Sequence, residues 1–496
     1  MKNPSQTDFS THVRLRFQLS VDTGTLPSDW KNAHVTPVYK KGDVHTAGNY
    51  RPVSLTSVIC KQLEHIVCRH LLQHLQGNDI LTPLNHGFRA GHSTETQLLT
   101  TVHDLLVAND KKSQTDVIIL DFSKAFDTVP HNLLLHKLTH YGINGTIHQW
   151  LSSFLTQRKM AVVLDGEHSS AVDVTSGVPQ GTVLGPLLFL CHINDLPDVV
   201  RSQVRLFADD CLLYRQIRSQ RDHLKLQDDL TQLQKWASDW GMRFNAGKCM
   251  VMSINSKTSH FYAINDHILQ HTSKHPYLGL TLSDDLKWST HINRTARKAN
   301  GVLALLRRNL GFCPESCKRT AYIALVRSIL EYGAIVWDPF LRKNIECLEK
   351  TQNRAVRFIC SDYTSREQGS ITRMREKLNL PTLASRRQVL KLTSFFKVVE
   401  GLVPALPIEN FLTKTRPKRN IKAKKFENYN TDNIVERQVT NNSKCYTVRH
   451  CNTEQLKNSY FVTTPLAWNH LPNEVIDSTS PEVFKAKIEK SHLRFD

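Results

Sequence analysis

Two apolar runs in the sequence lead directly into acidic residues. Residues 117–120 form a continuous apolar run, which is typical of a buried strand, and the next residue is Asp121. Further along, the runs 204–206 and 212–214 flank the tetrapeptide 207–210, Phe-Ala-Asp-Asp. This pattern predicts a β-hairpin with its acids near the tip. Carboxylates therefore fall at two strand ends, and we expect them to share one site.

Around these strands the apolar residues recur at helical spacing. Helices are predicted over 58–75, 132–141, 147–155 and 221–240, and from about 185 after a loop at 177–181. In the helix over 221–240, we expect Leu224, Leu230, Leu233 and Trp236 to lie near one face. Asp165-Gly166 is a favoured hairpin dipeptide. From residue 287 the pattern is mainly helical, as in 321–330 and 348–359. Mixed strands and helices of this kind indicate an α+β fold.

Positive charge is concentrated in one region of the chain. The sequence has 64 Lys and Arg against 45 Asp and Glu, a net charge of +19. Residues 287–425 hold 29 of the basic and 10 of the acidic residues, so the remainder is balanced. A solvated helical surface is one interpretation, but the concentration favours a polyanionic partner such as nucleic acid. The basic run 414–425 could be a linker, a backbone-binding strip or a nuclear address.

Carboxylates at neighbouring strand ends suit divalent metal ions. Mg²⁺ prefers hard oxygen ligands and keeps several waters, so a few Asp side chains and substrate phosphates suffice. Two ions roughly 3.5–4 Å apart can activate a 3′-hydroxyl and stabilise a leaving pyrophosphate. An isolated Asp-Asp pair is more often a polar turn. The assignment of Asp121, Asp209 and Asp210 as ligands therefore depends on the surrounding sequence.

Other metal sites and membrane segments are not indicated. The 11 cysteines and 24 histidines show no zinc-finger spacing, and Cys313 and Cys317 lack a matching downstream pair. Free thiols in a reducing compartment are expected. There is no secretory signal and no apolar stretch long enough to span a bilayer. We expect a soluble, intracellular protein.

A series of sequence blocks surrounds the acids in a fixed order. They are 29–43, 49–55, 86–89 with 93–94, 120–131, 176–189, 207–210, 241–248, 277–279, 330–339 and 468–472. In this order they resemble the motifs of reverse transcriptases from non-LTR (LINE-type) retrotransposons, nearest to the Jockey-like and chicken-repeat-like group. Blocks 120–131, 176–189, 207–210, 241–248 and 277–279 look like motifs A to E. So many blocks in order make the resemblance specific and extend it over nearly the whole chain.

The resemblance implies a right-hand polymerase built from fingers, palm and thumb. The expected divisions are 1–116 for N-terminally truncated fingers, 117–285 for the palm with motifs A to E, 286–365 for a helical thumb, and 366–496 for a basic C-terminal region. Two departures from the family pattern are Phe207, where Tyr is common, and Thr182, where Ser is common. Neither removes a catalytic group.

The resemblance also implies roles for residues of the metal site. Asp121 and Asp209 match the metal-binding aspartates, and Asp210 matches the second member of the motif C pair. Phe122 would add its backbone carbonyl. The expected cofactor is two Mg²⁺ ions, with Mn²⁺ as an alternative. Lys248 matches the motif D lysine proposed to protonate pyrophosphate, a general-acid role, although a lone lysine is more often a solvated surface charge.

Four residues are expected to contact the incoming nucleotide. Phe126 matches the bulky residue that excludes a 2′-hydroxyl by clash, and without the motif it would be assigned to the palm core. Gln180 matches the motif B glutamine that lies against the nucleotide. Lys41 and Arg51, together with the neighbouring Lys40, could grip a triphosphate, Arg as a fork and Lys as a point charge.

The nucleic acid itself is expected to contact four other positions. Arg89 is expected to touch the template backbone. Tyr277, Leu278 and Gly279 match motif E and are also expected to bind nucleic acid. The implied partners are an RNA template, a DNA primer and dNTPs.

The predicted function is that of an RNA-directed DNA polymerase that extends a DNA 3′ end. The alternative is a catalytically inactive, truncated transposon-derived protein that only binds nucleic acid. An RNA-splicing maturase is disfavoured because 468–472 and the thumb blocks resemble the retrotransposon group. No upstream endonuclease domain or cysteine-rich knuckle is apparent, so we expect target cleavage to come from elsewhere. The expected location is the nucleus at integration and the cytoplasm for the RNA-protein particle.

Overall fold

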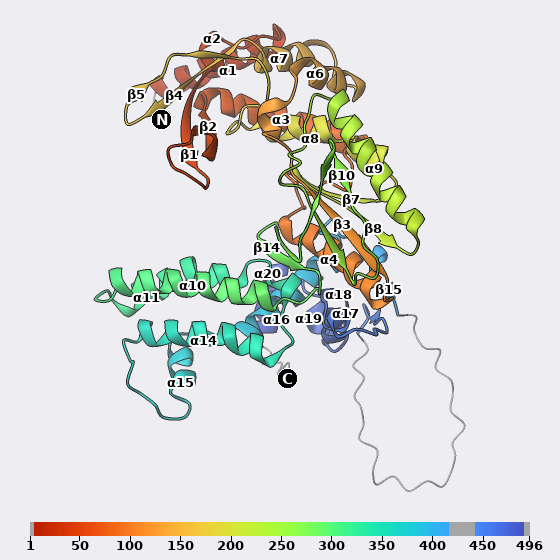
Figure 1. The fold of residues 1–496 in the computed structure, drawn as a ribbon. Coiled ribbons are helices and arrows are strands. Elements are labelled where there is room, and N and C mark those ends of the chain that lie inside the picture. The colour runs from red at the N-terminus through yellow and green to blue at the C-terminus, as the bar shows by residue number, and fades with distance from the viewer. Residues whose placement is uncertain (1–3, 416–441, 491–496) are drawn as a thin grey trace. The chain divides into compact units, whose positions relative to one another are not determined.

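The computed structural model describes residues 4–415 and 442–490, which fall into two compact units (Figure 1). Unit 1 comprises Met1–Ala90, Asp116–Val251 and Thr258–His271, and unit 2 comprises Gly91–Thr115, Met252–Lys257 and Thr272–Asp496. Most of the predicted basic run 414–425 lies outside the described residues. No helix in the described part of the chain is long and apolar enough to cross a membrane.

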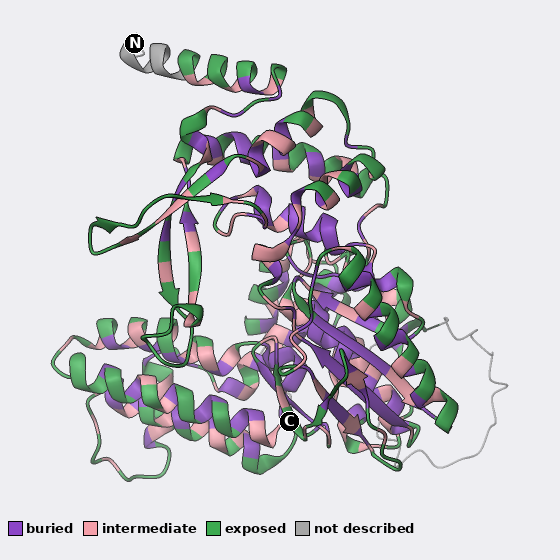
Figure 2. Cartoon of the chain, turned by 45° about the horizontal axis from the view of Figure 1, so that its top comes forward, coloured by how far each residue is buried: buried purple, intermediate pink, exposed green. Residues whose placement is uncertain are grey.

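The main sheet of unit 1 contains both acid-bearing strands. Its order is β12 (Gln270–His271), β9 (Met250–Ile254), β3 (Gln114–Leu120), β8 (Asp210–Ile217) and β7 (Gln203–Phe207). All seven residues of β3 are buried, as the purple strands of Figure 2 illustrate. Strands β7 and β8 pair antiparallel, with Phe207 opposite Asp210. The predicted strand before Asp121 and the predicted hairpin are both confirmed.

Helices pack their apolar faces against this sheet in one core. They are α3 (Val58–Gly77), α6 (His131–His140), α7 (Gly145–Leu155), α8 (Leu184–Ile193) and α9 (Gln220–Asp239), close to the predicted ranges. The placement of Leu224 on the buried face of α9 was wrong, because its side chain is 57% exposed. Leu226 occupies that face instead. It stands four residues before Leu230, one helical turn away, whereas a spacing of six points elsewhere.

A second sheet in unit 1 brings basic residues toward the acids. It contains β1 (Asn32–Tyr39), β2 (Tyr50–Leu55), β4 (Arg158–Leu164), β5 (Glu167–His168) and β6 (Val172–Val174). β1 pairs antiparallel with β2 and parallel with β4. Asp165 and Gly166 both have positive φ between β4 and β5, which confirms the predicted turn. The β1–β2 pairing holds Arg51 opposite Val38.

A buried carboxylate anchors the start of helix α8. Glu64 of α3 accepts hydrogen bonds from the backbone N–H groups of Val183, at 2.7 Å, and Leu184, at 3.1 Å. These are among the N–H groups that a helix leaves without internal partners. Burial lowers the pKa of the nearby Arg158 guanidinium, and the charge of Glu64 opposes that shift. Glu64 thus fixes the loop that precedes α8.

Unit 2 is mainly helical. Its longer helices are α4 (Thr94–Asp110), α10 (Ser289–Asn309), α14 (Arg342–Ile359), α16 (Leu383–Val399), α18 (Tyr460–Asn469) and α20 (Pro481–Lys490). Figure 1 shows α10 and α14 lying along each other, with α11 at one end of α10. The helix predicted over 321–330 is in fact divided into α11 (Glu315–Ala321), the π-helix η3 (Tyr322–Arg327) and α12 (Ser328–Glu331). The spacing of apolar residues in the sequence does not reveal such a change in backbone hydrogen bonding.

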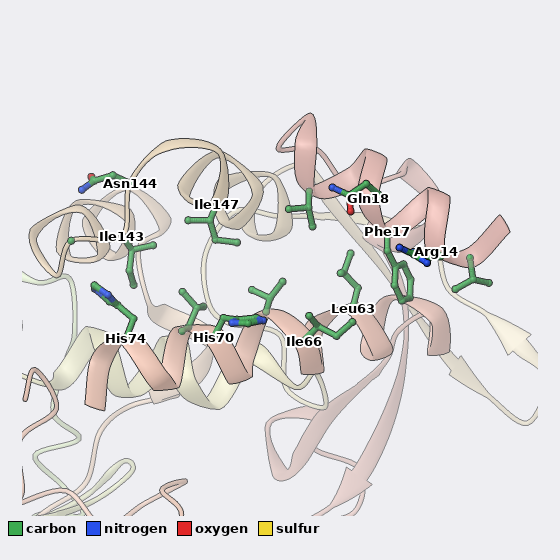
Figure 3. A pocket seen from close by; sticks show the side chains of 15 residues that line it. Arg14, Phe17, Gln18, Leu63, Ile66, His70, His74, Ile143, Asn144 and Ile147 are labelled. Carbon is green, nitrogen blue, oxygen red and sulfur yellow. The ribbon is translucent and has the colours of Figure 1, made fainter. Parts of the chain in front are cut away.

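Unit 1 also contains an apolar cavity of about 980 Å³ (Figure 3). Side chains of α1 (Pro4–Asp22), α3 and residues 142–147 line it, with Leu63, Ile66 and Phe17 among them. Arg14 and His70 supply polar atoms. None of the predicted site residues lines this cavity, so it is separate from the carboxylates.

We predict that Glu64→Ala destabilises the protein. The change leaves two buried N–H groups without an acceptor and the Arg158 charge uncompensated, at a cost of about 3 kcal/mol in the free energy of unfolding. Thermal and urea unfolding would measure it. The control is Glu346→Ala on the surface, where Glu346 pairs with Arg342 and their side chains are 49% and 93% exposed. That change is expected to cost at most about 1 kcal/mol. Equal shifts in both variants would contradict the anchoring role of Glu64.

Candidate active site

The β7–β8 turn holds two carboxylates in place. Ala208 and Asp209 form the turn, and Ala208 has a φ of 53°. The side chain of Asn85 accepts hydrogen bonds from Ala208 N at 3.2 Å and Gly87 N at 3.0 Å. A Cβ atom on Gly87 would lie 2.4 Å from Ala208 N, so only glycine permits this approach. The loop that contains Asn85 and Gly87 therefore supports the turn next to the two carboxylates.

Asp121 follows β3 and is flanked by the segment 241–248. Asn245 N donates to the Asp121 carbonyl at 2.7 Å, and Ser123 N donates to the Arg243 carbonyl at 2.8 Å. Between these bonds the rings of Phe122 and Phe244 stack with centroids 4.4 Å apart. Neither of these two backbone hydrogen bonds uses the Phe122 carbonyl, which is a predicted metal ligand.

This arrangement brings Lys248 to Asp121. The Lys248 Nζ atom lies 3.2 Å from Asp121 Oδ2, and their side chains are 55% and 41% exposed. Asp121 Oδ2 itself is buried and receives no well-aligned hydrogen bond from the described residues. An exposed ion pair of this kind contributes little to stability. Among the described residues, this oxygen is therefore held only by the exposed Lys248 ammonium group, which a metal ion could displace.

The three carboxylates influence one another electrostatically. Burial is the main cause that raises the pKa of Asp210 to about 6, and the negative charges of Asp209 and Asp121 contribute to this rise. Burial also raises the pKa of Asp209, with Asp121 adding to the effect. Both residues remain accessible to solvent at the turn. A cation among three such carboxylates would relieve their repulsion.

The donor set fits a hard divalent ion, because it consists of carboxylate oxygens of which one lacks a hydrogen bond. Within the described residues, however, no three His, Cys, Asp or Glu side chains are already gathered closely enough to hold a metal ion. The roles of Asp121, Asp209 and Asp210 as ligands therefore remain predictions.

Basic residues of the second sheet face the acids. Lys40 and Arg51 both lower the pKa of Asp209, and Lys40 also lowers that of Asp210. Lys40 N donates to Asn49 O at 2.9 Å, which places Lys40 at the end of the β1–β2 pairing. Lys41 is exposed and does not contribute to either shift. Of the adjacent pair that we predicted to grip a triphosphate, Lys40 acts electrostatically on the carboxylates, and the role of Lys41 stays a prediction.

The loop before α8 positions Gln180. Its side chain donates to Asp127 Oδ1 at 3.0 Å, and its carbonyl accepts from Ser54 N at 2.8 Å. Gly181 has a φ of 98°, and a Cβ atom there would lie 2.7 Å from Ser54 O. Burial raises the pKa of Asp127, while the hydrogen bond from Gln180 opposes the shift. Asp127 was not predicted as a site residue, although it lies in the same block as Asp121.

The ring of Phe126 packs against two other aromatic rings, and its contact with an incoming nucleotide stays a prediction. Its ring stacks on Phe189 with centroids 4.3 Å apart and meets Phe88 edge-on at 6.1 Å. It packs against the core but is only partly buried. A ring anchored in this way can present a fixed surface to a ligand.

The four residues that we predicted to contact nucleic acid are divided between the two units. Arg89 donates to the Thr82 carbonyl at 2.6 Å, and burial lowers its pKa, so it holds its own loop. Tyr277 is buried, and its hydroxyl accepts from Gln97 Nε2 at 3.2 Å. Leu278 and Gly279 form the turn between β13 (Lys274–Tyr277) and β14 (Leu280–Ser283). These three residues belong to unit 2, whereas the carboxylates belong to unit 1.

Comparison with known proteins gives one family. Residues 38–282 match the profile described as reverse transcriptase (RNA-dependent DNA polymerase), a span that includes every predicted site residue. The probable RNA-directed DNA polymerase from transposon BS of Drosophila melanogaster is 29% identical over 78% of this chain and 45% of its own length. The RNA-directed DNA polymerase from mobile element jockey of the same species is 29% identical over 70% of this chain and 39% of its own length. The chain spans less than half of these relatives.

Among solved structures, apo telomerase from Candida tropicalis aligns with a TM-score of 0.42 and 12% identity, over 81% of this chain and 72% of that chain.

Asp210→Asn should stabilise the metal-free protein at pH 7.5. Wild-type Asp210 is charged at that pH, and a pKa of about 6 in the folded state, above the ordinary 3.8, means that its ionisation disfavours folding. We expect a gain of about 1 kcal/mol after allowance for solvent screening. The gain should vanish as the pH falls through 6 toward 4, because the wild-type group becomes protonated.

Thermal unfolding in a chelating buffer between pH 4 and 8 would measure this difference. Asp173→Asn, in the exposed strand β6, serves as the control and should change little. A variant that is less stable than the wild type at pH 7.5, or a gain that persists at pH 4, would contradict the repulsion inferred at the turn.

Proposed function

We propose that the chain is an RNA-directed DNA polymerase of the non-LTR retrotransposon type, because residues 38–282 match the reverse transcriptase profile and the similar proteins named above come from such elements. It would add deoxynucleotides to the 3′ end of a DNA primer on an RNA template. The observation that supports this most is the electrostatic coupling of Asp121 with Asp209 and Asp210 at two strand ends within the matched domain.

The carboxylates would hold two Mg²⁺ ions, with Mn²⁺ as an alternative. Asp121 and Asp209 are the proposed ligands, joined by Asp210 and the Phe122 carbonyl. The chemistry that such ions supply is activation of the 3′-hydroxyl and stabilisation of the leaving pyrophosphate. The protein's own part is to keep the oxygens fixed on a buried sheet, so that little reorganisation is needed.

Other groups of the site would act on the nucleotide. Lys40 and Arg51 would attract the triphosphate, since both already lower the pKa of Asp209 through their charges. Lys248, beside Asp121, would donate a proton to pyrophosphate. The polar side chain of Gln180 and the ring of Phe126 would contact the base and sugar. Contacts within the protein hold both side chains in place, because Gln180 donates a hydrogen bond to Asp127 and Phe126 stacks on Phe189.

We further propose residues 286–365 as the thumb and 366–496 as a basic C-terminal region that assists nucleic-acid binding. The exposed cations of α10 and α14 suit a polyanion. Residues 1–116 would form the fingers and residues 117–285 the palm, in the order of the motifs. The protein would act in the nucleus and accompany its RNA in the cytoplasm.

The polymerase proposal is tested by primer extension. The purified chain, an RNA template, a DNA primer, Mg²⁺ and dNTPs should give extended DNA. An Asp209→Ala, Asp210→Ala variant should lose roughly a thousandfold in rate, because metal stabilisation of this step is worth several kcal/mol. Asp173→Asn should retain full activity. If no variant extends the primer but RNA binding persists, the chain is a nucleic-acid-binding protein without catalysis.

The role of Phe126 predicts altered sugar selection. Phe126→Ala should raise ribonucleotide incorporation relative to deoxynucleotide incorporation by about tenfold or more, because a steric clash is removed. Single-nucleotide insertion with paired dNTP and rNTP substrates measures the ratio. Phe126→Tyr should keep the wild-type preference. An unchanged ratio in Phe126→Ala, with activity retained, would show that Phe126 is only core.

A further inference from the structure

The turn after helix α10 presents an aromatic ring to solvent. Phe312 has a relative exposure of 109%, the highest among the large apolar residues of the described chain. A Cys313 N to Leu310 O hydrogen bond of 3.1 Å closes the turn, with Gly311 and Phe312 at its centre. Soluble proteins expose single apolar residues often, but a whole aromatic ring is costly to leave in water.

The turn is held at both ends. Leu310, the residue after α10, donates its N–H group to the Leu306 carbonyl at 2.8 Å. Pro314 immediately precedes α11, and Lys318 N donates to the Pro314 carbonyl at 3.1 Å. Phe312 therefore projects from a fixed point between two helices, which lowers the entropy cost of binding through the ring.

The surroundings of Phe312 are cationic. We define the helical tip as residues 305–319 and 357–378, which are joined by hydrogen bonds from Lys318 to Ser361 and from Arg319 to the Leu378 carbonyl. The tip contains nine Lys and Arg against four Asp and Glu. Its excess of positive charge opposes the approach of a second copy of the same surface and favours a polyanion.

A second exposed aromatic residue lies in the same tip. The Arg307 guanidinium lies over the ring of Tyr363, with its Cζ atom 5.1 Å from the centroid. Tyr363 is 45% exposed. Rings and stacked guanidinium groups on a cationic surface are the combination that receives unpaired nucleobases.

One face of α10 continues this surface. Arg297, Lys298 and Arg308 are exposed and form no ion pair with any described residue. Between them stand Gly301 and Ala304, both exposed, and a Cβ atom at Gly301 would meet nothing within 4 Å. At about 1.5 Å per residue, 297 to 308 covers about 16 Å, the length of about five phosphates of one strand. A nucleic-acid backbone can therefore lie along this face.

We propose that Phe312 stacks on an unpaired nucleobase of RNA whose phosphates contact the cationic face of α10. The proposal relies on the proposed function only for the choice of RNA as the ligand. Its residues belong to unit 2, whereas the carboxylates belong to unit 1, and the binding involves no chemical step. The cations of this surface can bind any polyanion. Phe312 adds a contact that only an unpaired base can make.

The test is equilibrium binding of a labelled single-stranded RNA of mixed sequence to the full chain, without Mg²⁺ or dNTPs. Phe312→Ala should weaken binding about fivefold or more, because a base-aromatic stack is lost. The slope of log affinity against log salt should stay unchanged. Arg308→Ala should instead lower that slope by about 0.7, the value for one phosphate on a single strand. Phe312→Trp should bind at least as well as the wild type.

Two matched measurements isolate the stacking. Phe261→Ala removes another exposed ring, 74% exposed, in unit 1 and should leave RNA binding unchanged. A blunt RNA hairpin closed by a short stable loop offers few unpaired bases, so Phe312→Ala should scarcely affect its binding. Thermal unfolding of each variant verifies that the fold is retained.

Several outcomes would overturn the proposal. They are wild-type affinity in Phe312→Ala, equal losses on single-stranded and hairpin RNA, or a loss of self-association in sedimentation with RNA affinity unchanged. The last would make Phe312 a contact between copies. Because binding is measured without catalysis, a chain that fails to extend primers can still confirm the role of Phe312, and an active polymerase can still refute it.

Discussion

Mutual repulsion among three carboxylates is the constraint on which the site depends. Asp121 follows a fully buried strand, Asp209 lies in the two-residue turn of the β7–β8 hairpin, and Asp210 begins β8, the neighbouring strand of the same sheet. Their charges disfavour one another, so a flexible chain would separate them. The main sheet prevents this, because Asn85 and Gly87 support the turn and the 241–248 segment clamps Asp121. The repulsion lowers the stability of the fold, but the sheet keeps the oxygen donors in fixed positions. Such a trade-off is common at functional sites.

Close backbone contacts position the residues that would contact a nucleotide, and larger side chains would not fit at two of the glycines involved. Gly177 and Gly181 have positive φ, and a Cβ atom at either would come within 2.7 Å of a carbonyl oxygen. The loop between them bonds to β2 through Ser54, and Glu64 fixes the helix that follows. This loop therefore joins β2 of the second sheet to the segment that follows Asp121, through bonds from Val178 N to the Phe126 carbonyl and from Gln180 to Asp127.

Much of this architecture could be predicted from local sequence pattern. The hairpin at 207–210, the strand before Asp121 and the helices of unit 1 follow from apolar periodicity and turn residues, and the structure confirms them. What could not be predicted depends on contacts distant in sequence. Whether Lys40 or Lys41 faces the acids is decided by the β1–β2 register, and the Asp127 partner of Gln180 by loop docking. The π-helical turn at Tyr322–Arg327 and the outward position of Leu224 show that periodicity alone misjudges local geometry.

The central claim is that Asp121, Asp209 and Asp210 form one site for two divalent ions. The most direct test is a crystal structure with Mn²⁺, an RNA–DNA primer-template and a non-reactive dNTP analogue, using anomalous scattering to locate the metal. The account predicts two Mn²⁺ peaks roughly 3.5–4 Å apart, contacting Asp121 and Asp209 and the analogue's phosphates. Metal density that is absent from these carboxylates while the nucleotide is bound, or that lies only at other residues, would contradict it.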